Sequence, residues 1–444
     1  MAYQDFNMDN QWLPFTPNRH FRKDPRVFVA ADGMEFTTHD GRKVIDGISS
    51  LWCVGAGHNR KPINEAIKTQ LDTLDYATAF QVSNDKAFKA AEMIASLAPG
   101  DLNKVLFCNS GSEAADTSMK VALAYHRARG EGHRNVFIGR EKGYHGVGFG
   151  GMSVGGIPGN RKVFGSAFLP RVDHMRFIHD PVNHAYIHNE EPVWAEDPLV
   201  ELETRILPLH DPSNVAAIIV EPVAGSAGWY LPPKGYLKRL REICDKHGIL
   251  LIFDEVITGF GRMGTNFASD YFGVVPDMLN FAKCVTNGVI PLGGVICRDK
   301  LYDAMMKTDA PEHVVEFFHG YTYSGHPVAC AAAIATLDLF KQENLFARAG
   351  EMGKVLGDAF HSTLKGLPNV ISIRSLGLAA AVELAPIAGT PGKRAYEIFL
   401  DCFHKGALVR PAGDVLVIAP PYIVEKSHID TLVNTLADSI KAHA

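Results

Sequence analysis

Short apolar runs separated by helical patterns constrain the fold of this chain more than any other feature. Strand-length apolar runs occupy residues 104–108, 135–139, 215–220, 249–253, 278–282 and 294–297. Residues 113–129 and 234–247 between them have the apolar spacing of amphipathic helices. Strands without polar alternation are buried on both faces, which is typical of a mainly parallel sheet covered by helices. We therefore predict an α/β fold for this part of the chain.

The last hundred or so residues show a different pattern. Helical patterns near 327–342, 346–364 and 427–442 flank shorter strands at 370–374 and 416–419, which predicts a smaller α+β domain. The first sixty residues hold short strands at 26–31 and 43–46, and we expect them to pack with that domain. A long helix starting at Pro327 would link the two parts. The expected division is an N-terminal segment, 1–60, a large domain, 61–328, and a small domain, 329–444.

The composition and net charge of the chain limit the classes of protein to which it can belong. The chain has 444 residues, a net charge of −5 and no basic excess, so we expect neither nucleic acid nor a membrane surface as a partner. The start carries no signal-peptide pattern, and no apolar run reaches membrane-spanning length. Seven cysteines without a C-x-x-C pair are typical of reduced thiols, and we expect a cytoplasmic protein. The 19 histidines show no metal-binding spacing, so no metal is expected.

Residues 248–264, GILLIFDEVITGFGRMG, combine two features that point to different cofactors. Asp254 follows an apolar strand, and a carboxylate in a dry cleft needs a cation such as a protonated pyridine nitrogen. Residues 259–264 match G-x-G-x-x-G, the pattern of dinucleotide-binding loops. That motif does not directly join a strand to a helix, and Asp277 is a poor candidate for the acidic ribose reader expected beyond it. For Asp254 alone, a surface salt bridge or a helix cap remains the alternative.

Three further stretches supply what a pyridoxal phosphate site requires. Lys283 follows the apolar run 278–282, where partial desolvation lowers a lysine pKa toward nucleophilic use. Residues 109–114, NSGSEA, open a helix, whose N–H groups and dipole favour an anion. Tyr144 lies between glycines after the strand 135–139 and could cover a ring. Taken singly, a solvated lysine, a plain N-cap and a turn tyrosine are the alternatives.

The ordered set resembles the class III (omega) aminotransferases of pyridoxal phosphate fold type I. The matching stretches are NSGSEAAD at 109–116, GYHG at 143–146, EPVAG at 221–225, LLIFDEVITGFGRMG at 250–264, AKCVTNG at 282–288 and HGYTYSGHPVA at 319–329. The resemblance covers nearly the whole chain. It implies a large domain with a mainly parallel, seven-stranded sheet between helices, a smaller α+β domain, and pyridoxal 5′-phosphate as cofactor.

The resemblance also implies roles for individual residues. Lys283 would form the Schiff base and move a proton, Asp254 would hold the pyridinium, and Tyr144 would stack on the ring. Thr322 would reach the phosphate of the neighbouring subunit, which implies a homodimer with shared active sites and possibly a tetramer. Glu221 would orient nearby groups. The full set of implied cofactor residues is Ser110, Gly111, Ser112, Tyr144, His145, Glu221, Asp254, Val256, Lys283 and Thr322.

Among these enzymes the resemblance is strongest to the beta-alanine–pyruvate group, through stretches such as WLPFTPNRHF and LPPKGYLKRLREIC. It implies transfer of an amino group from an ω-amino acid or primary amine to pyruvate, giving alanine and a semialdehyde or ketone. Arg410 matches a mobile arginine that grips a carboxylate. Ser226 stands where members that use 2-oxoglutarate often carry glutamate, which favours pyruvate. The implied substrate walls are Phe15, Trp52, Phe80 and Tyr144.

This sequence departs from the family pattern at residues 81–84, QVSN, where a His-Pro pair is often found. That departure leaves the pocket entrance and the preferred amine open. An aminomutase or decarboxylase on the same fold remains an alternative, and so does an enzyme that uses 2-oxoglutarate. A dehydrogenase that binds NAD through residues 259–264 is a remote alternative. A non-catalytic binding protein would be expected to lack Lys283.

Overall fold

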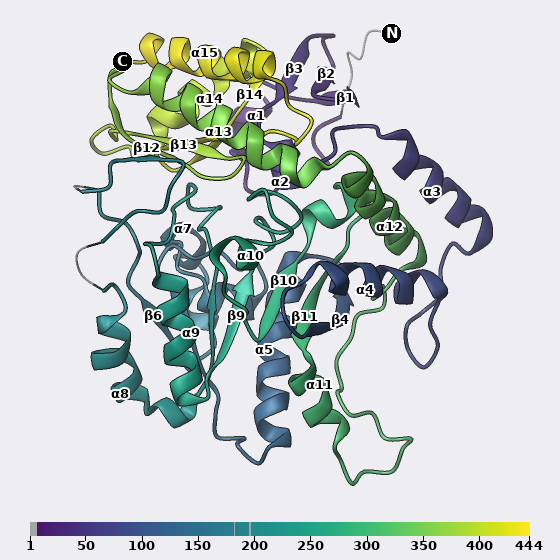
Figure 1. Ribbon diagram of the computed structural model, residues 1–444. Coiled ribbons are helices and arrows are strands. Elements are labelled where there is room, and N and C mark those ends of the chain that lie inside the picture. The colour runs from purple at the N-terminus through teal and green to yellow at the C-terminus, as the bar shows by residue number, and fades with distance from the viewer. Residues whose placement is uncertain (1–6, 182, 195–196) are drawn as a thin grey trace.

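The computed structural model describes residues 7–181, 183–194 and 197–444 and is built around a seven-stranded sheet (Figure 1). The strand order is β4-β11-β10-β9-β8-β5-β6. Its strands are β4 (Leu102–Cys108), β5 (Val136–Arg140), β6 (Val172–Met175), β8 (Val215–Val220), β9 (Leu250–Asp254), β10 (Met278–Phe281) and β11 (Gly293–Arg298). Every pairing from β10 to β6 is parallel, and only β11 runs antiparallel to its neighbours. The predicted mainly parallel, seven-stranded sheet is confirmed.

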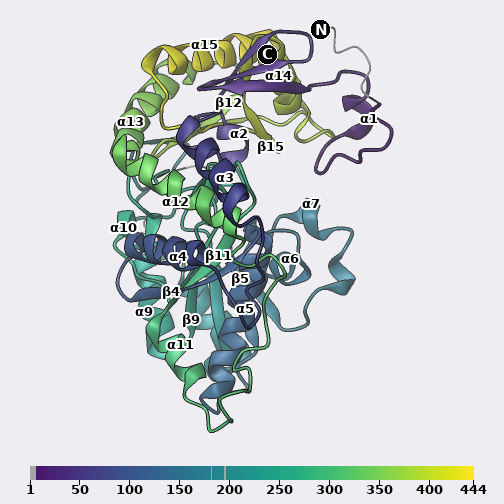
Figure 2. The same ribbon diagram turned by 90° about the vertical axis from the view of Figure 1, so that its right-hand side faces the viewer.

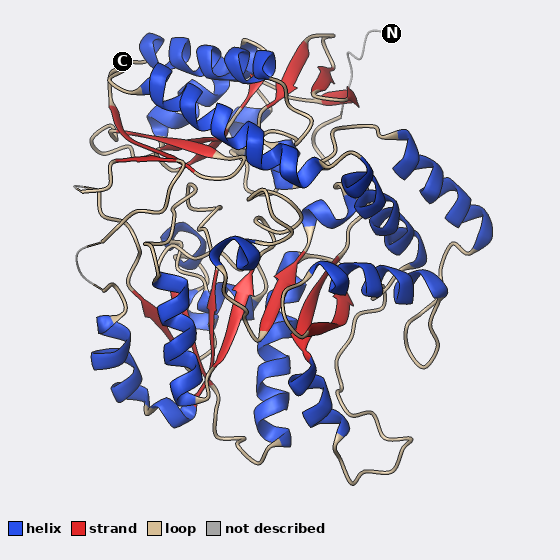
Figure 3. Ribbon diagram, in the orientation of Figure 1, coloured by secondary structure: helices blue, strands red, loops and turns tan. Residues whose placement is uncertain are grey.

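Helices cover both faces of this sheet (Figure 3). In β8, Val215, Ile218 and Val220 pack in the cluster that contains α9 (Tyr236–His247), whereas Ala216, Ala217 and Ile219 pack in the cluster that contains α5 (Gly111–Ala128). Successive side chains of a strand point to opposite faces, so α9 and α5 lie on opposite sides. Burial on both sides is why these strands are apolar without alternation.

The C-terminal part contains a five-stranded sheet with the order β15-β16-β13-β12-β7. The strands are β7 (Tyr186–His188), β12 (Val370–Ser375), β13 (Ala380–Leu384), β15 (Arg410–Ala412) and β16 (Val415–Ile418). The helices α12 (Pro327–Gln342), α13 (Leu345–Leu364), α14 (Lys393–His404) and α15 (Lys426–Ala442) accompany it. Strand β7 was not predicted, because three residues are too few to show a periodic pattern.

The N-terminal residues share a sheet with this C-terminal part. A four-stranded sheet has the order β1-β2-β3-β14, with β1 (Phe28–Asp32), β2 (Glu35–Thr38), β3 (Lys43–Asp46) and β14 (Ala407–Leu408). Strand β3 pairs in parallel with β14, so the two ends of the sequence share a sheet. Figure 2 shows these purple strands beside the yellow helix α15, above the large sheet.

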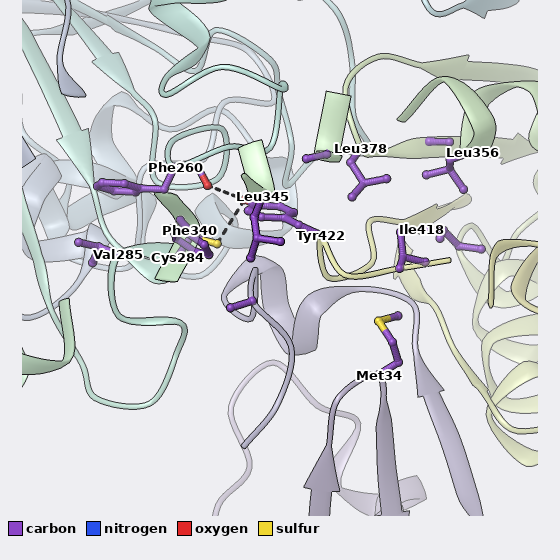
Figure 4. Packing of buried hydrophobic residues seen from close by; sticks show 14 of the residues in the cluster. Met34, Phe260, Cys284, Val285, Phe340, Leu345, Leu356, Leu378, Ile418 and Tyr422 are labelled. Atoms are coloured by element: carbon purple, nitrogen blue, oxygen red, sulfur yellow. Dashed lines mark hydrogen bonds between the residues drawn. The ribbon is translucent and has the colours of Figure 1, made fainter. Parts of the chain in front are cut away.

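The glycine-rich motif at residues 259–264 packs against helix α13 and is not a nucleotide-binding loop. Gly261 has φ +102°, and a Cβ on it would lie 2.3 Å from the Phe346 ring of α13. A Cβ on Gly264 would lie 2.8 Å from the Cα of Gly350 on the same helix. Tyr422 also contacts this motif: its hydroxyl donates a hydrogen bond to the Phe260 carbonyl at 2.7 Å (Figure 4). Its glycines therefore serve close backbone contact.

The carboxyl ends of β9 and β10 bring the two central residues of the predicted site to one edge. Asp254 is the last residue of β9, one position later than the predicted strand end, and is paired in register with Asn280 of β10. Lys283 opens the short 3-10 helix Lys283–Thr286 directly after β10. Parallel sheets bind ligands at this edge. Within the described residues, no helix is long and apolar enough to cross a membrane.

Candidate active site

The first wall of the site is the N-terminus of α5. Ser110 is the N-cap, and its side chain accepts a hydrogen bond from the Glu113 backbone N–H at 3.2 Å. The Glu113 carboxylate in turn accepts from the Asn109 backbone N–H at 2.7 Å, which fixes the turn before the helix. Ser112 Oγ accepts from the Val147 N–H at 3.1 Å. The start of an 18-residue helix with adjacent hydroxyls is suited to an anion such as phosphate.

The opposite wall holds a buried acid and its histidine partner. Asp254 is only 6% exposed, and one carboxylate oxygen lies 2.8 Å from Nδ1 of His145. Its second oxygen accepts from the Val256 N–H at 3.2 Å. The histidine is itself buried, and its Nε2 has no hydrogen-bond partner. This arrangement orients the carboxylate and leaves it able to hold a cation inside the chamber.

Lys283 lies between these walls in a strained backbone conformation. Its φ is +53°, a value that non-glycine residues rarely adopt and that often occurs at functional sites. Burial lowers the pKa of its amine, because the charged form is desolvated. The neighbouring Cys53 thiol has its pKa raised to about 11, also by burial, so it stays neutral beside the amine. A half-buried lysine with a lowered pKa is poised to act as a nucleophile or base.

Tyr144 is fixed over the chamber by a second buried acid, Glu221. The Tyr144 backbone N–H donates to one carboxylate oxygen of Glu221 at 2.9 Å, and the Gly225 N–H donates to the other at 3.0 Å. Desolvation raises the pKa of the Glu221 carboxyl. Both carboxylate oxygens accept from backbone groups, so Glu221 positions the turn that carries Tyr144.

These residues enclose one chamber of about 340 Å³. It is lined by nine of the ten predicted cofactor residues: Ser110, Gly111, Ser112, Tyr144, His145, Glu221, Asp254, Val256 and Lys283. A Cβ on Gly111 would meet the Val256 side chain at 2.8 Å, so glycine lets the helix start approach that side chain closely. The chamber thus has an anion site, a carboxylate and an amine around one space.

A second, larger cavity of about 820 Å³ opens from Lys283 toward the C-terminal part and the N-terminal segment. Its inner walls include Trp52, which is 1% exposed, has φ +67° and stacks on Trp229 with ring centroids 5.3 Å apart. Asp46 holds the turn before Trp52 by accepting from two backbone N–H groups, those of Ile48 and Ser50. Tyr144 and Lys283 line both cavities, so they form the passage between them.

Arg410 contributes a cation to this cavity. The residue is half-buried at the start of β15, and its Nη1 is buried without a hydrogen-bond partner. Burial lowers the pKa of the guanidinium, whereas Tyr144 and Glu221 act in the opposite direction. An unpartnered guanidinium beside a reactive amine is suited to bind a carboxylate.

The sequence comparisons identify the family of this fold and site. The class-III aminotransferase family model matches residues 18–440. The chain belongs to the class-III aminotransferases. An omega-aminotransferase of Caulobacter vibrioides is 51% identical over 97% of each chain. A beta-alanine–pyruvate aminotransferase of Pseudomonas aeruginosa is 48% identical, with 99% of this chain and 97% of that protein covered.

Solved structures agree with this assignment. The omega transaminase of Pseudomonas jessenii, solved in complex with PMP, matches with a TM-score of 0.89 and 30% identity over 98% of this chain and 96% of that one. Class-III aminotransferases depend on pyridoxal phosphate, and the 340 Å³ chamber fits that group. The helix start suits its phosphate, and Asp254 suits its ring nitrogen. Lys283 suits its aldehyde.

Two predicted site residues of the aminotransferase lie outside both cavities of their own chain. Thr322 is exposed, and its carbonyl accepts from the Tyr76 hydroxyl at 2.8 Å. Phe80 is 53% exposed and packs near Gly320. The unusual stretch 81–84 lies at the start of α4 (Asp85–Leu97), where Asn84 caps the helix by accepting from the Ala87 N–H at 2.9 Å.

The sequence prediction missed several lining residues. Cys53, Ile257 and Thr286 line the smaller chamber, and Ile257 also lines the larger cavity. Each stands within three residues of a predicted site residue, so proximity in the sequence was a signal for them. The contact between His145 and Asp254 joins a loop to the end of β9, 109 positions apart in the sequence, and had no signal in the sequence. Among the described residues, no group of three or more His, Cys, Asp or Glu side chains could hold a metal ion.

Proposed function

We propose that this aminotransferase moves an amino group from a beta-alanine-like ω-amino acid, or from a primary amine, to pyruvate. The products are alanine and a semialdehyde or ketone. The observation that carries the proposal is the guanidinium of Arg410, whose Nη1 lacks a partner in the cavity that Lys283 also lines. A donor whose amine reaches Lys283 can place its carboxylate on Arg410, and pyruvate can use the same contact.

The relatives support this choice of substrates. Proteins 48% and 46% identical to this chain are a beta-alanine–pyruvate aminotransferase and an omega-amino acid–pyruvate aminotransferase. Ser226 lines both cavities of this chain, so its small side chain stands at the passage between cofactor and substrate. A glutamate there would face Arg410 as an alternative partner. With serine at this position, the guanidinium is left for the substrate carboxylate.

Each residue of the chamber has a proposed task. Pyridoxal phosphate would supply the electron sink for a carbanion at the carbon that carries the donor's amine. Ser110, Gly111 and Ser112 would bind its phosphate, and Asp254 would keep its ring nitrogen protonated. Lys283 would attach the cofactor and, once freed, would take the proton from the amine-bearing carbon of the donor through Nζ. The proposal is supported by the common chamber that these residues line.

Other side chains position these groups and shape the substrate space. Tyr144 would cover the ring, and the neighbouring His145 orients the Asp254 carboxylate through its Nδ1 contact. Trp52 and Phe15 wall the substrate side, and the neutral state of the Cys53 thiol leaves the Lys283 amine without a competing ion pair. Exclusion of water by the aromatic walls strengthens the charge interactions inside.

We further propose a homodimer in which Thr322 completes the phosphate site of the partner subunit. Thr322 is exposed on its own chain, and large apolar side chains near it are exposed too: Phe80 at 53%, Phe88 at 70%, Phe318 at 84% and Tyr323 at 57%. An apolar patch of this kind is typical of an interface. Thr322→Ala should then weaken cofactor binding without changing the oligomer, as measured by cofactor titration and light scattering.

We also propose a cellular location and a domain division for this protein. We assign the protein to the cytoplasm, a proposal supported by its seven free cysteines, which suit a reducing compartment. We divide it into an N-terminal segment, 1–60, a large domain, 61–328, and a small domain, 329–444. The sheet shared by β3 and β14 supports the grouping of the first segment with the last domain.

The deciding experiment is a donor and acceptor panel with the purified holoenzyme. Alanine should form from pyruvate with beta-alanine as donor. Substitution of 2-oxoglutarate for pyruvate should lower the rate at least about tenfold, because its second carboxylate would enter the cavity without a cationic partner. Product formation without any alanine would indicate an aminomutase or a decarboxylase. Binding of NAD, with no yellow cofactor in the purified protein, would indicate the dehydrogenase alternative.

A further inference from the structure

The turn that carries Lys283 is held from outside at both of its ends. Lys283 opens the short 3-10 helix Lys283–Thr286 with a φ of +53°, and a residue in this conformation keeps it only where the surrounding structure enforces it. The far end of the turn is held by the side chain of Asn287. Its amide oxygen accepts from the Ala56 N–H at 2.8 Å, and its amide nitrogen donates to the Gly57 carbonyl at 2.8 Å.

The near end of the turn is held by Tyr422, a fully buried residue that follows β16. Figure 4 shows its hydroxyl between the Phe260 carbonyl, to which it donates at 2.7 Å, and Sγ of Cys284, at 3.3 Å. A phenol has one hydrogen, and the carbonyl takes it, so the thiol is the donor in the second contact. Burial raises the pKa of Cys284, so the thiol retains its hydrogen.

The position of Tyr422 does not depend on its hydroxyl. Its backbone N–H donates to the Gly55 carbonyl at 2.7 Å, and its own carbonyl accepts from Nε of Arg348 at 3.0 Å. The ring lies 4.8 Å from the Arg262 guanidinium and 5.8 Å from the Phe340 ring centroid. A Cβ on Gly55 would lie 2.7 Å from this ring. The hydroxyl is therefore presented to Cys284 from a fixed place.

We propose that Tyr422 is a positioning residue for Lys283. By accepting the hydrogen bond from Cys284, it fixes the turn in which Lys283 lines the chamber. The inference rests on the proposed function, because it takes Lys283 as the residue that attaches the cofactor. Neither Cys284 nor Tyr422 lines the chamber, so both act through the backbone of the turn and not by contact with cofactor or substrate.

The test measures how fast cofactor-free protein captures pyridoxal phosphate, a step in which Nζ of Lys283 attacks the aldehyde carbon and water leaves. Tyr422→Phe keeps the ring and removes the hydroxyl, and capture should slow at least about tenfold because the amine is misplaced. Pyridoxamine phosphate has no aldehyde, so its affinity should stay within about twofold of the wild-type value. Unchanged capture, or an equal loss for both forms of the cofactor, would overturn the proposal.

Substitutions of Cys284 test the hydrogen bond itself. Cys284→Ala removes the donor and should slow capture about fivefold, whereas Cys284→Ser keeps a donor and should stay within about threefold of the wild type. The double variant with Tyr422→Phe and Cys284→Ala should be within about twofold of Tyr422→Phe alone, since one contact is broken only once. Additive losses, or equal losses for serine and alanine, would show that the contact does not position Lys283. If Tyr422→Phe fails to fold, the serine and alanine variants decide alone.

Tyr125→Phe is the matched control for loss of a buried hydroxyl. Tyr125 is 6% exposed, its hydroxyl accepts from Arg129 at 2.6 Å, and it lines neither cavity. Capture by this variant should equal that of the wild type, and a loss like that of Tyr422→Phe would contradict a specific role for Tyr422.

The site of cofactor attachment distinguishes this inference from the proposed function. Borohydride reduction of the wild-type holoenzyme, followed by peptide mass spectrometry, should place the cofactor on Lys283. Attachment to another lysine would show that the proposed function is wrong, and this inference with it. Attachment to Lys283 together with unchanged capture in Tyr422→Phe would refute this inference alone.

Discussion

Replacement of Arg410 tests the central assignment of the substrate site. Arg410→Leu removes the guanidinium but keeps an apolar side chain of moderate size on β15. Two hydrogen bonds to a carboxylate contribute about 1.5–3 kcal/mol each, so loss of both lowers kcat/KM for beta-alanine and pyruvate roughly 10²- to 10⁴-fold. Arg410→Lys keeps the charge but not the planar fork, and the loss should be about ten- to hundredfold.

The same substitution should not destabilise the fold. Nη1 of Arg410 is buried without a partner, and burial lowers the pKa of the guanidinium, so the charged side chain is not contributing a paired interaction to the folded state. The free energy of unfolding of Arg410→Leu should therefore equal or exceed that of the wild type. Activity and stability are expected to change independently, which distinguishes a binding residue from a structural one.

The assay compares donors with and without a carboxylate in single-turnover half-reactions, followed by the absorbance of the bound cofactor. The half-reaction rate with beta-alanine should fall in Arg410→Leu. The rate with propylamine should stay within about threefold of the wild-type rate, since propylamine makes no charged contact there. Arg205→Leu removes an exposed arginine paired with Glu201 and is the control for loss of charge. An equal loss for both donors, or unfolding of the variant, would refute the reasoning.

Four further outcomes are expected. Lys283→Ala should abolish both turnover and the absorbance of the bound cofactor, and steady turnover in that variant would remove Lys283 from its role. Asp254→Asn should bind the cofactor more weakly and lose about 10²- to 10³-fold in rate, and a near-normal rate would contradict the assignment. Because burial lowers the pKa of Lys283 below the ordinary 10.5, cofactor capture by the cofactor-free protein should reach half its maximal rate below that pH, in contrast to a free lysine peptide. Gly261→Ala should destabilise by about 2–5 kcal/mol in urea unfolding, since its Cβ would lie 2.3 Å from the Phe346 ring at a φ of +102°, whereas Gly159→Ala meets no atom and should be near neutral.

The central sheet and the order of the site residues could be predicted from the sequence. Continuous apolar runs encode strands buried on both faces, because α5 and α9 cover opposite sides of them. The chain carries Asp254 and Lys283 at the carboxyl ends of two such strands, and neighbouring parallel strands place those ends together. Local periodicity and strand direction were sufficient for these two positions.

Positions that depend on distant contacts were decided only by the tertiary structure. Arg410 meets the cavity of Lys283 because β15 joins the five-stranded sheet, and no local pattern states where that sheet lies. Trp52 reaches the same cavity through a turn with positive φ values, held by Asp46. The glycines at 259–264 matched a nucleotide motif by letter, but their task is contact with α13. The glycines in the sequence show where the backbone can come close to another group. Only the tertiary structure shows that the group is helix α13 and not a nucleotide.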